Sequence, residues 1–150
     1  MWLDELNEFA DALALNTGAA GTYLVGDVID LGAGSKPLYD LDDLYLVITI
    51  DTAVTSGGSA TVQFILASDA QAAIAVDGSA TQHWASAAIA KATLVAGYVV
   101  AIVELPKQPV YERYLGILQV TGTAALTAGK FNAFLTLDPS NWVAIADGNQ

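Results

Sequence analysis

Two patterns of hydrophobic and polar residues divide the chain. In the first sixteen residues, Trp2, Leu6, Phe9 and Leu13 recur at spacings of four, three and four, and acidic residues fall between them. This period of about 3.6 residues predicts an amphipathic helix, which Asn16-Thr17-Gly18 would end. A helix this short is marginal alone in water. It must therefore dock, either on its own β domain or on a partner chain.

From residue 17 onward, short runs rich in Val, Ile, Thr, Tyr and Phe alternate with clusters of Gly, Asp, Ser and Pro. Such runs predict about eight strands at a spacing near ten residues, which is typical of an antiparallel sandwich or jelly roll. No second helical pattern separates them, so parallel βαβ units are disfavoured. Thr55-Ser56-Gly57-Gly58 is expected to form a hairpin turn. The predicted strands are Thr22–Asp30, Asp43–Asp51, Ala60–Ser68, Gly97–Glu104, Tyr111–Thr121 and Gly129–Leu137, with weaker candidates at Gln71–Val76 and Thr81–Ala90.

We therefore expect an all-β, jelly-roll-like sandwich over residues 17–150, preceded by an N-terminal amphipathic arm over residues 1–16. A jelly roll closes its core between two sheets, so the helix is not needed for folding. Its large apolar side chains are favoured anchors for an interface. The alternative is that the apolar stripe covers an open end of the same domain.

The charge balance restricts the possible partners. Sixteen acidic residues oppose five basic ones, for a formal net charge of -11. Such a surface repels nucleic acid and anionic lipid. No apolar run reaches membrane-spanning length, and the N-terminus lacks the positive region of a signal peptide. Charged residues make up only 14% of the chain, against about 25% in typical domains. Either the surface is rich in small neutral residues, or part of it is buried in an assembly.

Candidate catalytic and metal-binding residues are few. The chain has one His and no Cys, which leaves His83 as the only possible histidine of a catalytic triad and rules out a multi-His metal site. Asp40, Asp42 and Asp43 supply oxygen ligands of the kind Ca²⁺ prefers, but their spacing lacks the glycine and distal glutamate of an EF-hand loop. We expect no enzymatic activity, no cofactor and no metal.

Two further sets of residues could serve binding. Arg113, the only arginine, lies between an acid and a tyrosine, and would either pair with an acid locally or anchor an interface. Strand aromatics could form a sugar-binding face, although such residues belong more often to a core. The aromatic candidates are Trp84, Tyr98, Tyr111 and Tyr114.

The order of segments between about Asn16 and Asp138 resembles the small capsid cement proteins of Bordetella-phage-type podoviruses and related tailed phages. The Asp40-Leu41-Asp42-Asp43 insertion, the first fifteen residues and the tail around Trp142 depart from this pattern. The resemblance rests on these segments in order: Asp27-Val28-Ile29-Asp30-Leu31-Gly32, Pro37-Leu38-Tyr39 with Leu44-Tyr45-Leu46-Val47, Thr55-Ser56-Gly57-Gly58 with Ala60-Thr61-Val62, Leu94-Val95-Ala96-Gly97-Tyr98, Arg113-Tyr114-Leu115-Gly116, and Thr127-Ala128-Gly129-Lys130 with Ala133-Phe134-Leu135-Thr136.

The resemblance implies a jelly roll without catalysis that binds the outer surface of a shell of major capsid protein after synthesis in the host cytoplasm. It also implies self-association as a homodimer, with a trimer as the alternative. A carbohydrate- or receptor-binding β module of a phage tail or fibre is the competing hypothesis. The expected interface residues are Trp2, Leu6, Phe9, Leu13 and Arg113.

Overall fold

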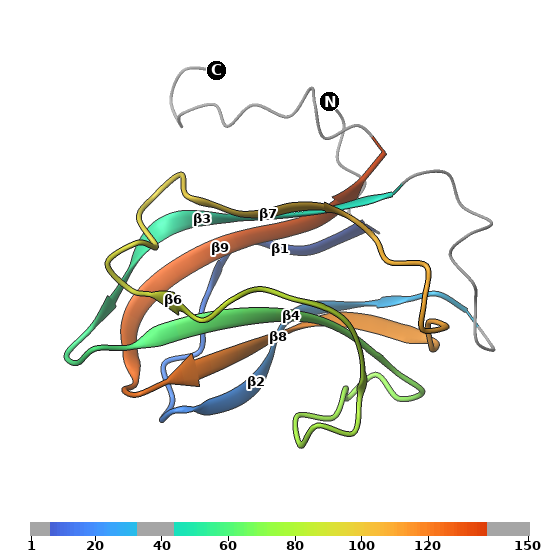
Figure 1. Cartoon of the computed structure of the whole chain (residues 1–150), viewed down its shortest axis with the longest axis horizontal. Coiled ribbons are helices and arrows are strands. Elements are labelled where there is room, and N and C mark those ends of the chain that lie inside the picture. Colours follow the sequence, from blue (N-terminus) through green and yellow to red (C-terminus); the bar gives the residue numbers. More distant parts are fainter. Residues whose placement is uncertain (1–6, 33–43, 138–150) are drawn as a thin grey trace.

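The computed structural model describes residues 7–32 and 44–137. They form two antiparallel β-sheets that face each other (Figure 1). No described residue belongs to an α-helix, and so none forms a helix long and apolar enough to cross a membrane. The strands are β1 (Glu8–Ala14), β2 (Gly21–Asp30), β3 (Tyr45–Ser56), β4 (Thr61–Asp69), β5 (Thr81–Ala85), β6 (Ile89–Ala90), β7 (Val99–Glu104), β8 (Tyr114–Gly122) and β9 (Leu126–Thr136).

The strand order is that of a jelly roll. Sheet A has the order β1-β9-β3-β7, and sheet B has the order β2-β8-β4-β5, with β6 also paired to β4. We treat β5 and β6 as one interrupted edge strand. The chain then crosses from one sheet to the other at each step except the step from β4 to β5, which stays within sheet B, and this is the order of a jelly roll. The predicted fold class is confirmed.

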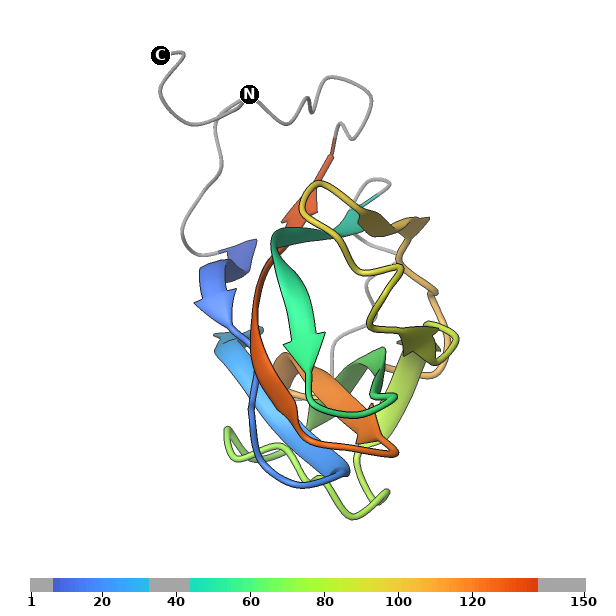
Figure 2. The same cartoon turned by 90° about the vertical axis from the view of Figure 1, so that its left-hand side faces the viewer.

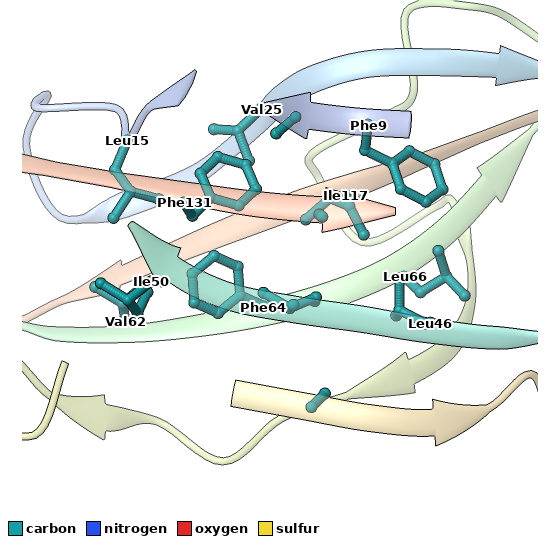
Figure 3. Packing of buried hydrophobic residues seen from close by; sticks show 14 of the residues in the cluster. Phe9, Leu15, Val25, Leu46, Ile50, Val62, Phe64, Leu66, Ile117 and Phe131 are labelled. Carbon is teal, nitrogen blue, oxygen red and sulfur yellow. The ribbon is translucent and has the colours of Figure 1, made fainter. Parts of the chain in front are cut away.

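The core lies between the two sheets because alternate residues of each strand point inward. Leu46, Ile48 and Ile50 of β3 are buried against Phe64 of β4 and Phe131 of β9 (Figure 3). The rings of Phe64 and Phe131 lie 5.6 Å apart at a tilt of 41°. The pattern of large apolar residues at every second position therefore predicts both the strands and their inward face.

A second, smaller apolar cluster lies on the outer face of sheet B. Ile65 of β4 and Leu118 of β8 point away from the main core and pack with Ile74. Gly116 leaves room for Ile74, whose Cδ1 would lie 2.7 Å from a Cβ added at that position. The weaker strand predicted at Gln71–Val76 is therefore wrong. That segment lies in the loop between β4 and β5 and covers the sheet instead of extending it.

The turn at Gly57 and Gly58 does not form the predicted hairpin. It joins β3 of sheet A to β4 of sheet B, and these two strands do not pair. The Gly-rich sequence correctly marks a reversal of the chain. It does not specify whether the next strand pairs with the first or crosses to the opposite sheet.

The N-terminal helix expected from the first residues is also wrong over the part that the structure describes. Residues 8–14 form strand β1, which pairs antiparallel with β9. A bulge between Ala10 and Leu13, where Ala12 has a φ of 47°, breaks the two-residue alternation. The four-residue spacing of Phe9 and Leu13 therefore matches a helical repeat, although both residues lie in a strand. Residues 8–14 are an edge strand of the sandwich, and pairing with β9 satisfies backbone groups that an isolated helix would satisfy internally.

Gly26 allows β2 and β1 to approach closely. It has a φ of +80°, and a Cβ at this position would overlap the carbonyl oxygen of Phe9. We expect Gly26→Ala to lower the free energy of unfolding by about 2 kcal/mol or more, because left-handed strain and a backbone clash add. Urea titration measures this loss. Gly78→Ala is the matched control, since Gly78 has a φ of +94° but no atom within 4 Å of its added Cβ. Equal losses in both variants would contradict a role for the contact with Phe9.

Candidate interaction surface

The strongest polar constellation in the described residues is centred on His83. Its Nε2 lies 2.7 Å from the hydroxyl of Ser68, which also accepts a hydrogen bond from the backbone N–H of Glu112 at 3.0 Å. The ring stacks on Tyr111 with 3.7 Å between centroids. Tyr111 in turn donates to the carbonyl of Pro106. These contacts tie the segment between β7 and β8 to β4 and β5.

This arrangement resembles the Ser–His half of a nucleophilic site, but its geometry does not suit catalysis. Ser68 is fully buried, so no substrate reaches its hydroxyl. Within the described part of the chain His83 Nδ1 has no hydrogen-bond partner, and an orienting carboxylate is what a triad requires there. Glu112 instead accepts from Thr81. The network holds the fold together.

Burial lowers the pKa of His83 to about 4, and the nearby Glu112 carboxylate opposes this shift only in part. Protonation would place a hydrogen on both ring nitrogens, and Nδ1 has no acceptor. Burial also raises the pKa of Tyr111. Both side chains are therefore neutral near pH 7, as a packed pair requires.

The four aromatic candidates do not form an exposed platform for sugar. Tyr111 is fully buried beneath His83, and Trp84 and Tyr98 pack against the main core cluster. Tyr114 lies under the guanidinium of Arg113, 5.0 Å from its ring centroid. The packing therefore gives no support to a carbohydrate-binding face built from these residues.

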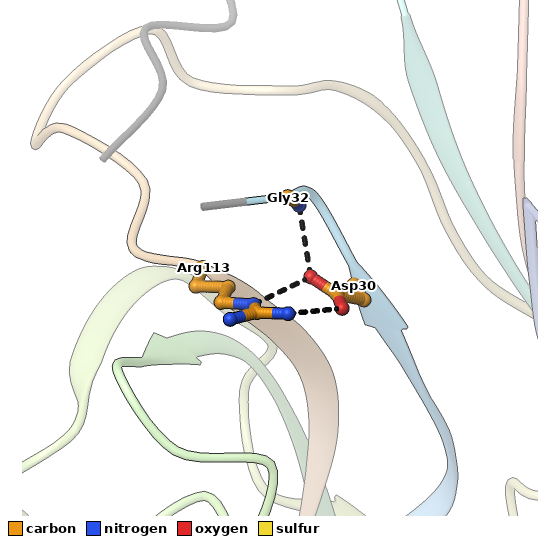
Figure 4. Close-up of polar contacts among 3 residues, drawn as sticks. All are labelled: Asp30, Gly32 and Arg113. Carbon is orange, nitrogen blue, oxygen red and sulfur yellow. Dashed lines mark hydrogen bonds and ion pairs between the residues drawn. The ribbon is translucent and has the colours of Figure 1, made fainter. Parts of the chain in front are cut away.

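Arg113 pairs with an acid within its own chain. Its Nε and Nη2 donate to the two carboxylate oxygens of Asp30 at 3.0 and 2.9 Å, and Gly32 N–H donates to the same carboxylate (Figure 4). These hydrogen bonds lower the pKa of Asp30 to about 2. The pair connects the end of β2 to the start of β8. Both side chains remain partly exposed, so the local pairing leaves a further contact with a partner open.

The other expected interface residues fall in different places. Phe9 is 1% exposed and belongs to the main core, whereas Leu13 is 40% exposed. Trp2 and Leu6 lie outside the described residues. So do Asp40, Asp42 and Asp43, and elsewhere in the described chain no three His, Asp or Glu side chains gather as metal ligands. Of the two described residues of the apolar stripe, Phe9 and Leu13, only Leu13 is thus exposed at the surface.

An exposed apolar surface occurs elsewhere, around β7. Val95, Val99 and Ile102 are 52%, 44% and 46% exposed. We call residues 85–103 the β7 flank. Figure 2 shows β7 and the β5–β6 segment on the same side of the sandwich, opposite β1 and β2. This flank presents mainly small or aliphatic side chains to solvent.

The β7 flank is also nearly free of charge. Residues 78–103 contain no Asp or Glu, although the whole chain has sixteen acids. Lys91, the one Lys or Arg there, donates its Nζ to the carbonyl of Ser56 at 2.6 Å. The sequence carries this signal only as a gap in the acidic residues, which contains no catalytic motif. A charge-poor apolar surface on an acidic protein is a candidate for contact with another protein.

The topology and this surface define a jelly-roll domain with a neutral apolar flank. Residues 9–135 match the family model described as Bbp16, and the chain belongs to this family. Bbp16 is a Bordetella phage protein, so the membership is consistent with the phage protein family that the sequence resemblance predicts. No curated protein matches the chain.

Proposed function

We propose that this protein is a capsid cement protein, which binds the outer surface of the assembled shell of major capsid protein and stabilises it. The observation that carries the proposal is membership of the Bbp16 phage family over residues 9–135. That membership indicates a structural protein of the phage particle. The decoration role is the specific form that the jelly roll and its surface favour.

The surface properties suit this role. With a net charge of -11 the protein repels packaged nucleic acid, which favours a place on the outside of the particle. The neutral β7 flank offers an area where another protein can approach without meeting a carboxylate. The buried Ser68–His83 pair gives no accessible nucleophile. We therefore propose that the protein acts by binding alone, without cofactor or catalysis.

A cement protein stabilises its shell by mass action. It binds the assembled lattice and not the free subunit, so its binding free energy adds to that of the shell. A homodimer would hold two shell sites together, and the second contact gains from effective concentration. Each contact between the protein and the shell can then be weak, and the dimer still binds the shell stably.

The test uses shells that lack this protein, prepared from the same phage. Purified protein should co-sediment with the assembled shells but not with free capsid-protein subunits, and it should raise the temperature at which the shells break apart. An unrelated protein of similar acidic charge is the control for nonspecific trapping of protein in the sedimented shells. Cryo-electron microscopy of the virion then locates the density. Density confined to the tail, or equal binding to free subunits, would refute the cement role.

A further inference from the structure

The segment between β7 and β8 is tied to sheet B through a single imidazole ring. We call residues 106–112 the connector. Near its end, Tyr111 stacks on the ring of His83 with 3.7 Å between centroids. The next residue, Glu112, donates its N–H to the hydroxyl of Ser68, which also contacts Nε2 of the same ring. The state of His83 therefore bears directly on how the connector is held against β4 and β5.

The contact between Ser68 and His83 holds one hydrogen. Oγ lies 2.7 Å from Nε2 and already accepts the N–H of Glu112 at 3.0 Å. The hydroxyl of Ser68 donates its own hydrogen to Nε2, which can accept it while the imidazole is neutral. A protonated imidazole is a donor at both nitrogens. The serine hydrogen must then turn away from the ring, and the hydrogen bond that it donated is lost.

The other ring nitrogen adds to the cost of protonation. Within the described residues Nδ1 of His83 is buried without a hydrogen-bond partner, and the residue is only 8% exposed. A charged ring in the closed arrangement would carry an unpaired N–H beneath Tyr111, out of contact with water. Burying a charge without full hydrogen bonding costs several kcal/mol. The closed connector therefore accepts only the neutral ring.

Few ionisable groups face this ring from the elements packed against it. The connector contributes Tyr111, which burial keeps neutral, and the carboxylate of Glu112. Strand β4 contributes Ser68, and the carboxylate of the next residue, Asp69, accepts from N–H groups of the following loop. Strand β5 has no titratable side chain besides His83. Glu112 favours the charged ring, but burial outweighs it and lowers the pKa of His83 to about 4.

From these contacts we propose that the connector is an acid-sensitive switch, in which protonation of His83 releases Tyr111 and the connector from β4 and β5 while the two sheets stay folded. Release brings the ring into contact with water, where the imidazolium is hydrated. The tyrosine leaves with the connector, because its hydroxyl donates to the carbonyl of Pro106 within the same segment.

The connector can open without unfolding the strands because its two ends are held separately. At one end Leu105 donates its N–H to the carbonyl of Leu44, and at the other Arg113 accepts at its carbonyl from the N–H of Leu31. Between these points residues 107–110 are exposed. This exposed turn moves when the connector opens, so a contact that another protein makes through it would weaken in acid.

The two pKa values of His83 set the size of the effect. The open connector exposes a ring with the ordinary value of 6.5, whereas the closed connector holds a ring with a value of about 4. The open form therefore binds a proton that the closed form does not, and acid favours opening. Between pH 7 and 4.5 the ratio of open to closed molecules should rise on the order of 50-fold.

Amide hydrogen exchange of the wild type measures this ratio at the N–H of Glu112, which donates to Ser68 in the closed form. After correction for the intrinsic exchange rate at each pH, we expect protection of this amide to fall on the order of 50-fold between pH 7 and 4.5. Low urea should leave its exchange unchanged because local opening exposes little surface, whereas buried amides of β8 should exchange faster in urea. A Glu112 amide that exchanges only together with the β8 amides would refute separate opening of the connector.

Two variants identify the titrating group. His83→Gln keeps a hydrogen-bonding side chain beside Ser68 but does not titrate, so protection of the Glu112 amide should no longer depend on pH in this range. Asp30→Asn is the matched control for general loosening, because it removes the ion pair with Arg113 next to the connector. It should retain the pH dependence. Equal pH dependence in His83→Gln and the wild type would overturn the switch.

A third measurement needs no substitution. His83 is the only histidine, so its ring signals in the NMR spectrum of the wild type report its protonation without ambiguity. We expect a titration midpoint well below pH 6.5, with the ring signals of Tyr111 changing over the same range. A midpoint near 6.5, or Tyr111 signals that do not follow the protonation of His83, would contradict the switch. These experiments use the free protein, so their outcome is independent of the proposed cement role.

Discussion

Replacing Phe9 by Ala is expected to lower the free energy of unfolding by about 3–5 kcal/mol, the usual cost of truncating a buried phenylalanine. Phe9 is 1% exposed and packs in the main core between the two sheets (Figure 3). Its loss would leave a cavity at the edge where β1 closes the sandwich. Urea or guanidinium titration of the variant, followed by circular dichroism or fluorescence, measures the change.

Leu13→Ala is the matched control for Phe9→Ala. Both residues lie on β1 and on the apolar stripe of the sequence, but Leu13 is exposed. We expect it to lose well under half as much stability. If Phe9→Ala unfolds no more easily than Leu13→Ala, then residues 8–14 act as an attachment arm outside the core, as the helical spacing indicates, and the assignment of Phe9 to the core fails.

Most strands were predictable because each carries its own signal. β4 and β8 combine β-branched residues with alternating burial, and the predicted Ala60–Ser68 and Tyr111–Thr121 agree with them to within a few residues. β3 extends five residues further than predicted, to Ser56, because its pairing with β9 continues past Asp51 through irregular register. Sheet partners, more than local sequence, decide where such a strand ends.

What sequence alone could not supply depends on contacts between distant residues. Strand β1 is formed by pairing with β9, more than a hundred residues away, and Ala12 N–H donates to the side chain of Asn132 at 2.6 Å. No periodicity in residues 1–16 reports that partner. The turn at Gly57 likewise gives no sign that its two strands enter different sheets.

The candidate surface was partly readable from the sequence. The absence of acids over residues 78–103 is visible without a structure. That β7 lies at the edge, and that Ile102 points outward beside Val47, follow only from the strand order and register. Similarly, the sequence shows His83 as an isolated residue. It contacts Ser68, which lies 15 positions earlier in the sequence, and Tyr111, which lies 28 positions later.

The free energy of unfolding should depend on pH through His83. His83 is only 8% exposed, and burial lowers its pKa from 6.5 to about 4. The unfolded chain therefore binds a proton between these two values that the folded chain does not. The stabilisation is fully present above pH 6.5 and is lost as the pH falls toward 4. At about 1.4 kcal/mol for each pH unit, we expect the protonation of His83 to lower the free energy of unfolding by about 3 kcal/mol.

We expect His83→Gln, which keeps a hydrogen-bonding group near Ser68 but does not titrate, to remove most of the fall in stability between pH 6.5 and 4. Urea titrations across this range measure it. Asp30→Asn is the control: hydrogen bonds from Arg113 and Gly32 lower the pKa of Asp30 from 3.8 to about 2, so its contribution is lost only below pH 3.8. This variant should keep the slope between pH 6.5 and 4 and change the slope at lower pH. If His83→Gln retains the wild-type slope, the acid sensitivity arises elsewhere in the protein.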